Sequence, residues 1–277
     1  MILDMTSPDS AFDAILDFFE LTGSDFIKKY YIDCHGDVEC FIETYIDKLQ
    51  ALNIEDIHLV VLHVTSNDNK CDDICKQGLN NLQYVLSEDT SLNRFLFQHN
   101  VQFDVIMRTL RVGSQQFNID YNYYQNKDDY DLTLREKRLK EIGRKLYFDY
   151  QINGFFFTQD VKKYGTNIYE RPEFLLTLSN LNANLAELND KWTASSQGYK
   201  IKFLAPFNQF AWFTFSCYNR EYEYNDDACC GWLQAKKWML SLAVDIANSN
   251  ICGDKYVYMK PDSVILPDQI LEISKIQ

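Results

Sequence analysis

The chain has 277 residues, of which 46% are hydrophobic and 24% charged, so it can bury a sizeable core. The excess of 40 acidic over 27 basic residues gives a formal net charge of −13 at pH 7, which opposes non-specific binding to nucleic acid. Only 10 glycines and 5 prolines are present, which excludes a collagen-like or proline-rich linker protein.

The amino terminus lacks the basic start and apolar run of a secretory signal, and no window approaches about 18 uncharged apolar residues. We therefore expect a cytoplasmic protein that makes no membrane contact. The 8 cysteines include no C-x-x-C pair, and only 4 histidines could join them as metal ligands. We therefore expect reduced thiols. The alternative is a metal or redox site at Cys71 and Cys75, which are four residues apart and would share a helix face.

Two amphipathic helices are predicted in the first fifty residues, the first capped by Ser10 and the second over residues 38–49. We interpret residues 1–54 as a helical lead-in. Residues 57–64 are apolar and β-branched, which predicts a buried strand, and the polar residues 65–69 that follow predict a loop.

The remaining chain, residues 55–277, is predicted to form one domain in which strands and helices are interspersed. Its expected helices are 71–77, capped by Gly78, then 89–97, 132–150, a helix from Pro172, and 230–248. Its expected strands are 101–112, 155–158, 199–204, 210–215 and 255–259, with a long loop over 116–131. The predicted class is α+β.

A basic helix stands out in this acidic protein, because residues 135–145 hold six basic residues and two acidic ones. Such a run is typical of a solvated helix face that balances the acidic residues preceding it. The alternative is a contact with a nucleic acid or a partner protein through Arg135, Arg138 and Lys145.

Three short stretches carry a possible active site. The first is Leu62-His63-Val64-Thr65, followed by Ile74 and by Gly78-Leu79. The second is Gly154-Phe155-Phe156-Phe157-Thr158, with tyrosines beyond it, and the third is Gly253-Asp254-Lys255-Tyr256-Val257-Tyr258. Their order resembles the ADP-ribosyltransferase fold of the diphtheria-toxin and poly(ADP-ribose) polymerase type. The first stretch is also similar to the DarT-type transferases of toxin–antitoxin systems.

The resemblance implies a split β-sheet core that binds NAD as co-substrate. His63 matches the histidine that holds the adenosine ribose, and Thr65 matches the hydroxyl residue two positions on; both side chains suit a ribose diol. Tyr164, or alternatively Tyr169, matches the tyrosine that stacks on nicotinamide. NAD would enter between the His63 strand and the second strand, where Phe157 is counted among the NAD-binding residues.

The catalytic acid has two candidates. Asp254 stands where the family places its glutamate, and a carboxylate there would stabilise the positive charge that develops on the ribose as nicotinamide leaves. The rival is Glu223 in the Glu221-Tyr222-Glu223 stretch, whose spacing resembles the arginine–serine–glutamate branch. Two departures are that Val64 replaces a glycine of the polymerase branch and that Asp254 is one methylene shorter than glutamate.

The resemblance therefore implies an NAD-dependent mono-ADP-ribosyltransferase without a bound metal. We expect a toxin or antiviral effector that modifies a nucleic acid or a host protein and is neutralised by an antitoxin-type partner. A different class remains open, in which the same fold has lost catalysis and acts as a binding protein.

Overall fold

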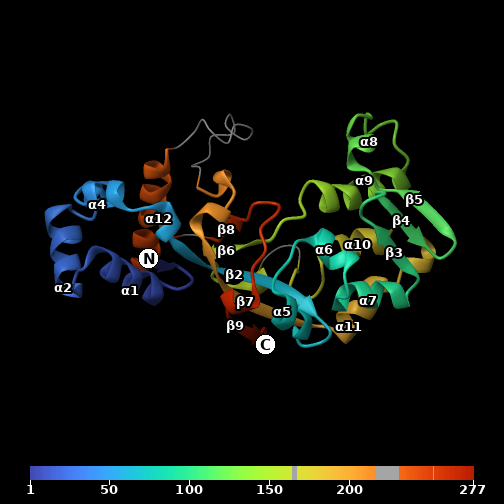
Figure 1. Cartoon of the computed structure of the whole chain (residues 1–277), viewed down its shortest axis with the longest axis horizontal. Helices are drawn as coiled ribbons and strands as arrows, with labels where there is room; N and C mark the ends of the chain where they lie inside the picture. Colours follow the sequence, from blue (N-terminus) through green and yellow to red (C-terminus); the bar gives the residue numbers. More distant parts are fainter. Residues whose placement is uncertain (164–166, 216–230, 252) are drawn as a thin grey trace. The chain divides into compact units, whose positions relative to one another are not determined.

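A computed structural model describes residues 1–163, 167–215, 231–251 and 253–277 (Figure 1). The chain combines helices with antiparallel strand pairing, which confirms a mixed α and β class but not the particular transferase fold. It divides into two compact units. Unit 1 comprises residues 1–62, 153–159 and 202–260, and unit 2 comprises residues 63–152, 160–201 and 261–277. Within the described ranges, no helix combines the length and the apolar character needed to span a membrane.

The strands of unit 1 follow the order β8-β6-β2-β7, with β1 parallel to β2. They are β1 (Ile2–Asp4), β6 (Asn153–Phe157), β8 (Lys255–Tyr258), and parts of β2 (His58–Asn67) and β7 (Gln197–Pro206). β6 pairs antiparallel with both β2 and β8. A Cβ at Gly154 would lie 2.6 Å from the Leu62 carbonyl oxygen, so the close approach of β6 to β2 requires glycine.

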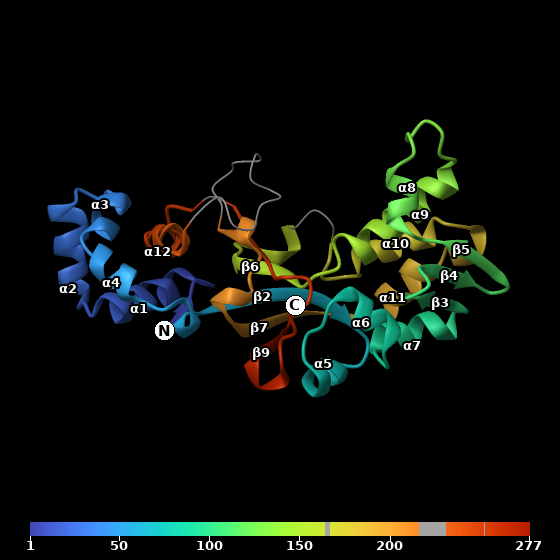
Figure 2. The same cartoon turned by 45° about the horizontal axis from the view of Figure 1, so that its top comes forward.

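The helices of unit 1 include the predicted lead-in, which packs on a helix from much later in the chain. α1 and α3 both contact α12 (Figure 2). The buried Lys236 of α12 donates from Nζ to the carbonyl oxygens of Leu49 and Leu52, each at 2.6 Å, and so caps α4. The helices are α1 (Pro8–Phe19), α2 (Gly23–Phe26), the π-helix η1 (Ile27–Asp33), α3 (Val38–Glu43), α4 (Ile46–Ala51) and α12 (Trp232–Ala247).

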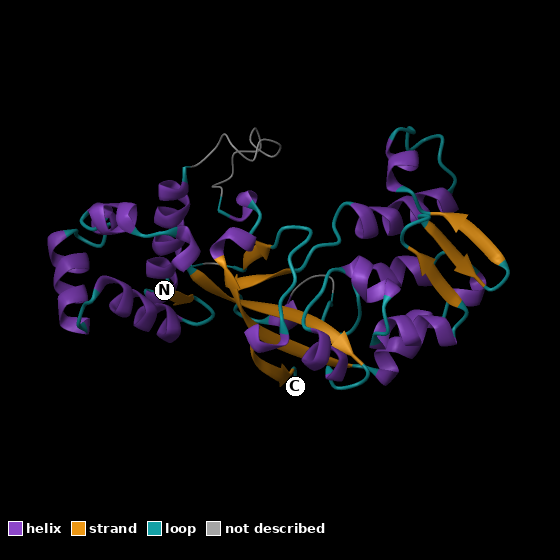
Figure 3. Cartoon of the chain, in the orientation of Figure 1, coloured by secondary structure: helices purple, strands orange, loops and turns teal. Residues whose placement is uncertain are grey.

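Unit 2 is built around one apolar cluster that includes Leu96, Leu110, Ile142, Leu175 and Trp192. A separate sheet in the order β3-β4-β5, drawn in orange at one end of Figure 3, packs with the helices of this unit. The elements are α5 (Asp72–Gln77), α6 (Leu82–Ser87), α7 (Ser91–Gln98), β3 (Val101–Asp104), β4 (Thr109–Val112), β5 (Gln115–Asn118), α8 (Tyr121–Gln125), α9 (Leu134–Tyr147), α10 (Glu173–Ser179), α11 (Leu188–Ser195) and β9 (Ile270–Lys275).

Short 3-10 helices complete the two units. They are η2 (Ile54–Asp56), η3 (Val161–Lys163), η4 (Ala183–Leu185), η5 (Phe207–Gln209), η6 (Trp212–Thr214) and η8 (Pro267–Gln269).

Several predicted elements need correction. The first helix begins at Pro8, and its cap is Ser7 instead of the predicted Ser10. The Ser7 side chain accepts a hydrogen bond from the Ser10 amide. The predicted strand 210–215 is wrong: its centre is η6, and only Phe210 forms an isolated bridge, with Met259.

The region of the predicted strand 101–112 and the predicted loop 116–131 is also different. It holds the three strands β3, β4 and β5 and then α8. The alternating pattern of residues 101–112 predicts one strand, but these residues form β3 and β4. One face of this sheet is solvated, so the exposed polar residues of β5 have a composition typical of a loop. Asp120 caps α8 with its side chain, a signal that was missed.

We predict that Gly143→Ala in α9 destabilises the protein by about 1 to 3 kcal/mol, because the added Cβ would lie 2.3 Å from the Ile119 carbonyl oxygen. In an exposed helix interior the same change is stabilising by up to about 1 kcal/mol, so the sign of the effect is diagnostic. Urea unfolding followed by circular dichroism measures it, with the exposed Lys137→Ala of the same helix as the control. A stabilised Gly143→Ala variant would contradict the packing of α9 on Ile119.

Candidate functional site

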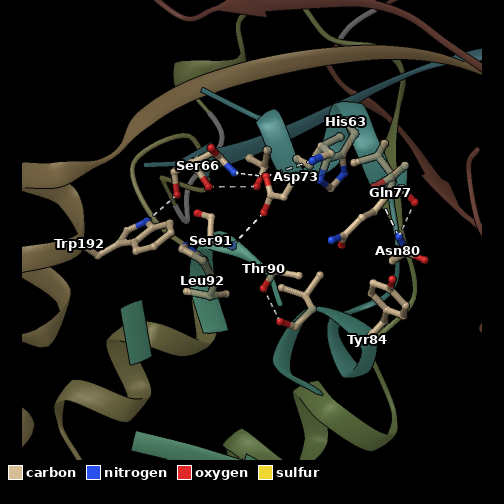
Figure 4. Close-up of a pocket in the computed structure, with 17 residues that line it drawn as sticks. His63, Ser66, Asp73, Gln77, Asn80, Tyr84, Thr90, Ser91, Leu92 and Trp192 are labelled. Carbon is tan, nitrogen blue, oxygen red and sulfur yellow. Dashed lines mark hydrogen bonds between the residues drawn. The ribbon is translucent and has the colours of Figure 1, made fainter. Parts of the chain in front are cut away.

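A pocket of about 100 Å³ lies in unit 2, at the end of β2, which is several times the volume needed by one water (Figure 4). β2 contributes His63 and Thr65, and α5 and the turn after it contribute Gln77 and Asn80. α6, the start of α7 and α11 complete the wall. The pocket therefore collects side chains from segments that are more than a hundred residues apart in the sequence.

His63 and Thr65 face the pocket together because they are two positions apart on a strand. Val64 between them points to the other face and is 5% exposed. Thr65 Oγ1 lies 3.4 Å from the Ser66 carbonyl oxygen, which is a long hydrogen bond for a hydroxyl. The strand continues to Asn67, so the predicted loop at residues 65–69 begins later, and Thr65 occupies a strand position.

The carboxylate of Asp73 joins three segments of the pocket wall (Figure 4). Its Oδ1 accepts from Asn67 Nδ2 at 3.1 Å and from the Ile74 amide at 3.0 Å. Its Oδ2 accepts a hydrogen bond at 2.9 Å from the amide of Ser91, which is the first residue of α7. Because β2, α5 and α7 meet on this one group, Asp73 sets the width of the pocket.

Gly78 ends α5, as predicted, and the chain then turns beside the pocket. Its φ of +79° lies in the region that favours glycine, and a Cβ there would lie 2.0 Å from the Ile265 carbonyl oxygen. The next residue, Leu79, exchanges two backbone hydrogen bonds with Ile265, at 2.9 and 3.0 Å. This bridge holds Gln77 and Asn80 on either side of the turn at the pocket.

The opposite wall is fixed by a buried indole. Trp192 is 1% exposed, and its Nε1 donates to Ser66 Oγ at 2.8 Å. Ser91 Oγ donates to Asp68 Oδ1 at 2.5 Å, which ties α7 to the chain that leaves β2. These contacts attach the end of β2 and the residue that follows it to α11 and α7.

The lining carries a single formal charge, that of Asp73, and no Lys or Arg among the described residues lines it. The Asp73 carboxylate is already hydrogen-bonded to the wall. An imidazole, hydroxyls and amides remain as the polar groups, which suit an uncharged ligand rich in hydroxyl or amide groups.

The described residues that line this pocket do not include the two tyrosines predicted to stack on nicotinamide. Tyr169 is half-buried and does not line the pocket; a hydrogen bond with Glu170 and burial raise the pKa of its phenol. Tyr164 lies outside the described residues, as do Glu221 and Glu223.

Asp254 and Phe157 belong to unit 1, where the pairing of β6 with β8 brings them to the same end of the sheet. Phe157 is the register partner of Lys255, the residue that follows Asp254. Both side chains are partly exposed.

The basic face of α9 is partly used within the protein. Lys145 forms 2.6 Å ion pairs with Asp149 and Glu173; burial lowers the pKa of Lys145, but these two contacts outweigh it and raise the pKa overall. Arg138 donates to the Asn180 carbonyl oxygen. Arg135 is exposed to solvent.

The alternative cysteine site is not supported by the geometry of the described residues, in which no group of three His, Cys, Asp or Glu side chains is arranged to hold a metal. Cys71 is buried directly before α5, and burial and the Asp73 carboxylate raise the pKa of its thiol to about 12. Cys75 is exposed on the same helix.

Sequence reasoning missed most of the pocket. It did not identify five of the lining residues: Asp73, Gln77, Asn80, Tyr84 and Trp192. One signal was present, because Asn67 ends the buried strand and Asp73 follows it, and polar residues just after a buried strand often form a binding site. No family model, curated protein or solved structure matches the chain.

We predict that Asp73→Ala lowers the free energy of unfolding by about 2 to 4 kcal/mol, because three donors from three segments lose a charged acceptor. The neighbouring Asp72→Ala is the matched control. Asp72 pairs with Lys76 at the surface, and its loss should change stability by less than about 1 kcal/mol. Chemical denaturation of the two variants gives the comparison, and equal losses would argue against a special role for Asp73.

We predict that iodoacetamide at pH 8 alkylates Cys75 at least about 100-fold faster than Cys71, because only the thiolate reacts and the Cys71 thiol is both buried and protonated. Peptide mass mapping over time measures both rates in one sample. In denaturant the two thiols should react at similar rates, and an equally fast reaction in the native protein would show that Cys71 is accessible.

Proposed function

We propose that this chain is an NAD-dependent mono-ADP-ribosyltransferase. The observation that supports the proposal best is that His63 and Thr65 line one pocket at the end of a buried strand, followed by the α5 helix and the Gly78-Leu79 turn. This is the arrangement that the resemblance to the transferase family implies for the NAD ribose.

In this proposal His63 and Thr65 bind the adenosine ribose. A ribose diol needs groups that both donate and accept hydrogen bonds, and an imidazole and a hydroxyl do both. The lining around them holds the Asp73 carboxylate and no Lys or Arg, so it fits a nucleoside better than it fits a phosphate, and the pyrophosphate of NAD would extend out of the pocket. Tyr164, with Tyr169 as the alternative, is the proposed residue for the nicotinamide stack.

The chemical step would be cleavage of the bond between the ribose C1′ and the nicotinamide nitrogen. Nicotinamide leaves with the bonding electron pair and becomes neutral, and the cation left on the ribose is attacked by a nucleophile of the acceptor. A carboxylate close to C1′ would stabilise that cation, and we assign this role to Asp254, with Glu223 as the alternative. Because Asp73 is engaged by the pocket wall, it is not proposed as the acid.

The acceptor is proposed to be a nucleic acid or a host protein, as in a toxin or antiviral effector that an antitoxin-type partner neutralises in the cytoplasm. Of the three basic residues suggested for this contact, Arg135 is exposed, whereas Lys145 and Arg138 are bound within the protein. Arg135 is therefore the preferred contact residue.

A binding protein without catalysis is the second candidate. It is favoured by one observation: the carboxylate in the pocket lining, that of Asp73, is committed to hydrogen bonds with the wall, while an imidazole and a hydroxyl line the same pocket. Such a protein would bind a nucleoside or nucleotide and leave it intact.

We predict that His63→Ala lowers the rate of NAD consumption at least about 100-fold. The substitution removes a contact with the adenosine ribose, and this contact would help to position the C1′ atom of the nicotinamide ribose. The melting temperature should stay near that of the parent. His58→Ala is the matched control, because His58 lies on the same strand but does not line the pocket. The assay follows labelled NAD with and without a cell extract as the source of acceptor.

Asp254→Ala in the same assay separates the two candidate functions. A transferase that uses Asp254 loses turnover while its calorimetric affinity for NAD stays within a few-fold, and full activity would transfer the role to Glu223. If the parent protein consumes no NAD and labels no product under any condition, the enzyme proposal fails. NAD binding that His63→Ala abolishes would then support the binding protein.

A further inference from the structure

The turn between β3 and β4 displays two large apolar side chains to solvent. Ile106 is 91% exposed and Met107 is 70% exposed. The turn itself is held firmly: the Met107 amide donates to Asp104 Oδ1 at 2.8 Å, and Tyr147 Oη donates to the Val105 carbonyl oxygen at 3.0 Å. The two side chains are therefore presented by an ordered backbone.

Arg108 completes the turn in a conformation that non-glycine residues rarely adopt, with φ of +53°. Its guanidinium forms a 2.6 Å ion pair with Asp120 and lies 5.0 Å from the centre of the Tyr147 ring. The Arg108 carbonyl oxygen also accepts from the Ile119 amide at 2.9 Å. Surrounding contacts thus maintain the strained residue, and strain of this kind is common at functional positions.

These contacts hold the turn against Asp120 and Tyr147, each of which is followed in the chain by an aromatic residue. Tyr121 follows Asp120, and its ring lies 5.9 Å from that of Phe148, which follows Tyr147 and is 58% exposed. We call Ile106, Met107, Tyr121 and Phe148 the turn patch. It contains the residue types enriched at the centres of protein interfaces, around an ion pair that is already satisfied.

A patch of this kind is unfavourable to leave in water, and its rigidity lowers the entropy lost when it is covered. The charges around the patch determine which kind of partner can bind there. Arg108 and Asp120 cancel, whereas the whole protein carries −13, so two copies would repel one another less at this patch than over the acidic surface.

The rim of the patch is self-complementary. Glu141 and Arg144 lie on the exposed side of α9, two turns and one turn before Phe148, respectively, and neither forms an ion pair among the residues that the structure describes. In a two-fold symmetric pair, residue i of one copy meets residue j of the other and the reverse. Glu141 of each copy can then face Arg144 of the other.

We propose that the turn patch is the interface through which two copies of this chain form a symmetric dimer. Ile106 and Met107 of each copy pack on Tyr121 and Phe148 of the other, and the two Glu141–Arg144 contacts set the antiparallel direction of the α9 helices. The proposal concerns a surface distinct from the pocket and does not depend on the proposed function.

Sedimentation equilibrium of the full chain tests the proposal. We expect a concentration-dependent dimer whose dissociation constant increases roughly tenfold or more in Ile106→Ser/Met107→Ser, since truncating central apolar contacts weakens an interface by at least this much. Ile32→Ser is the matched control, because Ile32 is 62% exposed on η1 in unit 1. Circular dichroism confirms that the variants are folded. A parent that stays monomeric up to about 0.5 mM, or a dimer unaffected by the double substitution, overturns the proposal.

Charge exchange gives a second, partner-specific test. Glu141→Arg and Arg144→Glu should each weaken self-association, whereas an equimolar mixture of the two variants should form a heterodimer, because every contact then joins opposite charges. The chain that carries both substitutions should dimerise like the parent. Association of the mixture no stronger than that of either variant alone would reject the antiparallel arrangement. A dimer that only an added nucleic acid or an acidic protein dissociates would instead assign the patch to that partner.

Discussion

The carboxylate of Asp73 is the interaction on which the pocket of unit 2 depends. Through the Asn67 side chain and the amides of Ile74 and Ser91, it fixes the end of β2 against the beginnings of α5 and α7. A carboxylate can do this because its two oxygens accept several hydrogen bonds at once, whereas an amide or a hydroxyl would leave a buried donor unpaired. These hydrogen bonds join three segments of the pocket wall, and the close approach at Gly78 and the hydrogen bond of Trp192 position two further parts of it.

This constraint separates structure from chemistry within the site. Asp73 holds the segments of the wall together, and His63 and Thr65 are the β2 side chains that we propose contact a ligand. Preorganisation of this kind matters for a bond cleavage in which charge develops on a sugar, since displacement of a group by about 1 Å can reduce the rate a hundredfold. The same rigidity would serve a binding protein, which is why the acid, and not the pocket, distinguishes the two candidate functions.

Local signals predicted many of the elements well. Gly78 ends α5 and Thr90 caps α7 because a left-handed glycine and a hydroxyl side chain satisfy helix ends without help from distant residues. Elements that depend on partners were harder to predict. The aromatic run from Phe210 to Phe215 has strand composition, yet it forms a 3-10 turn, because only Phe210 finds a strand neighbour. The polar β5 was mistaken for a loop because pairing with β4, and not its own composition, makes it a strand.

The sequence alone determined the mixed class and the buried strand that was predicted over residues 57–64. The structure extends this strand to Asn67, so Thr65, which was predicted in a loop, shares one strand face with His63. Only the tertiary structure decided which side chains surround them. Gln77, Tyr84 and Trp192 reach the pocket from segments that no sequence period relates, and a satisfied carboxylate such as Asp73 is recognised only from its donors. Likewise, the turn that carries Ile106 and the end of α9 are some forty residues apart in the sequence, and the contacts of Tyr147 with Arg108 and Val105 bring these two segments together in the tertiary structure. The physical reason is that strand and helix periods follow from local backbone geometry, whereas a pocket or an interface follows from long-range packing.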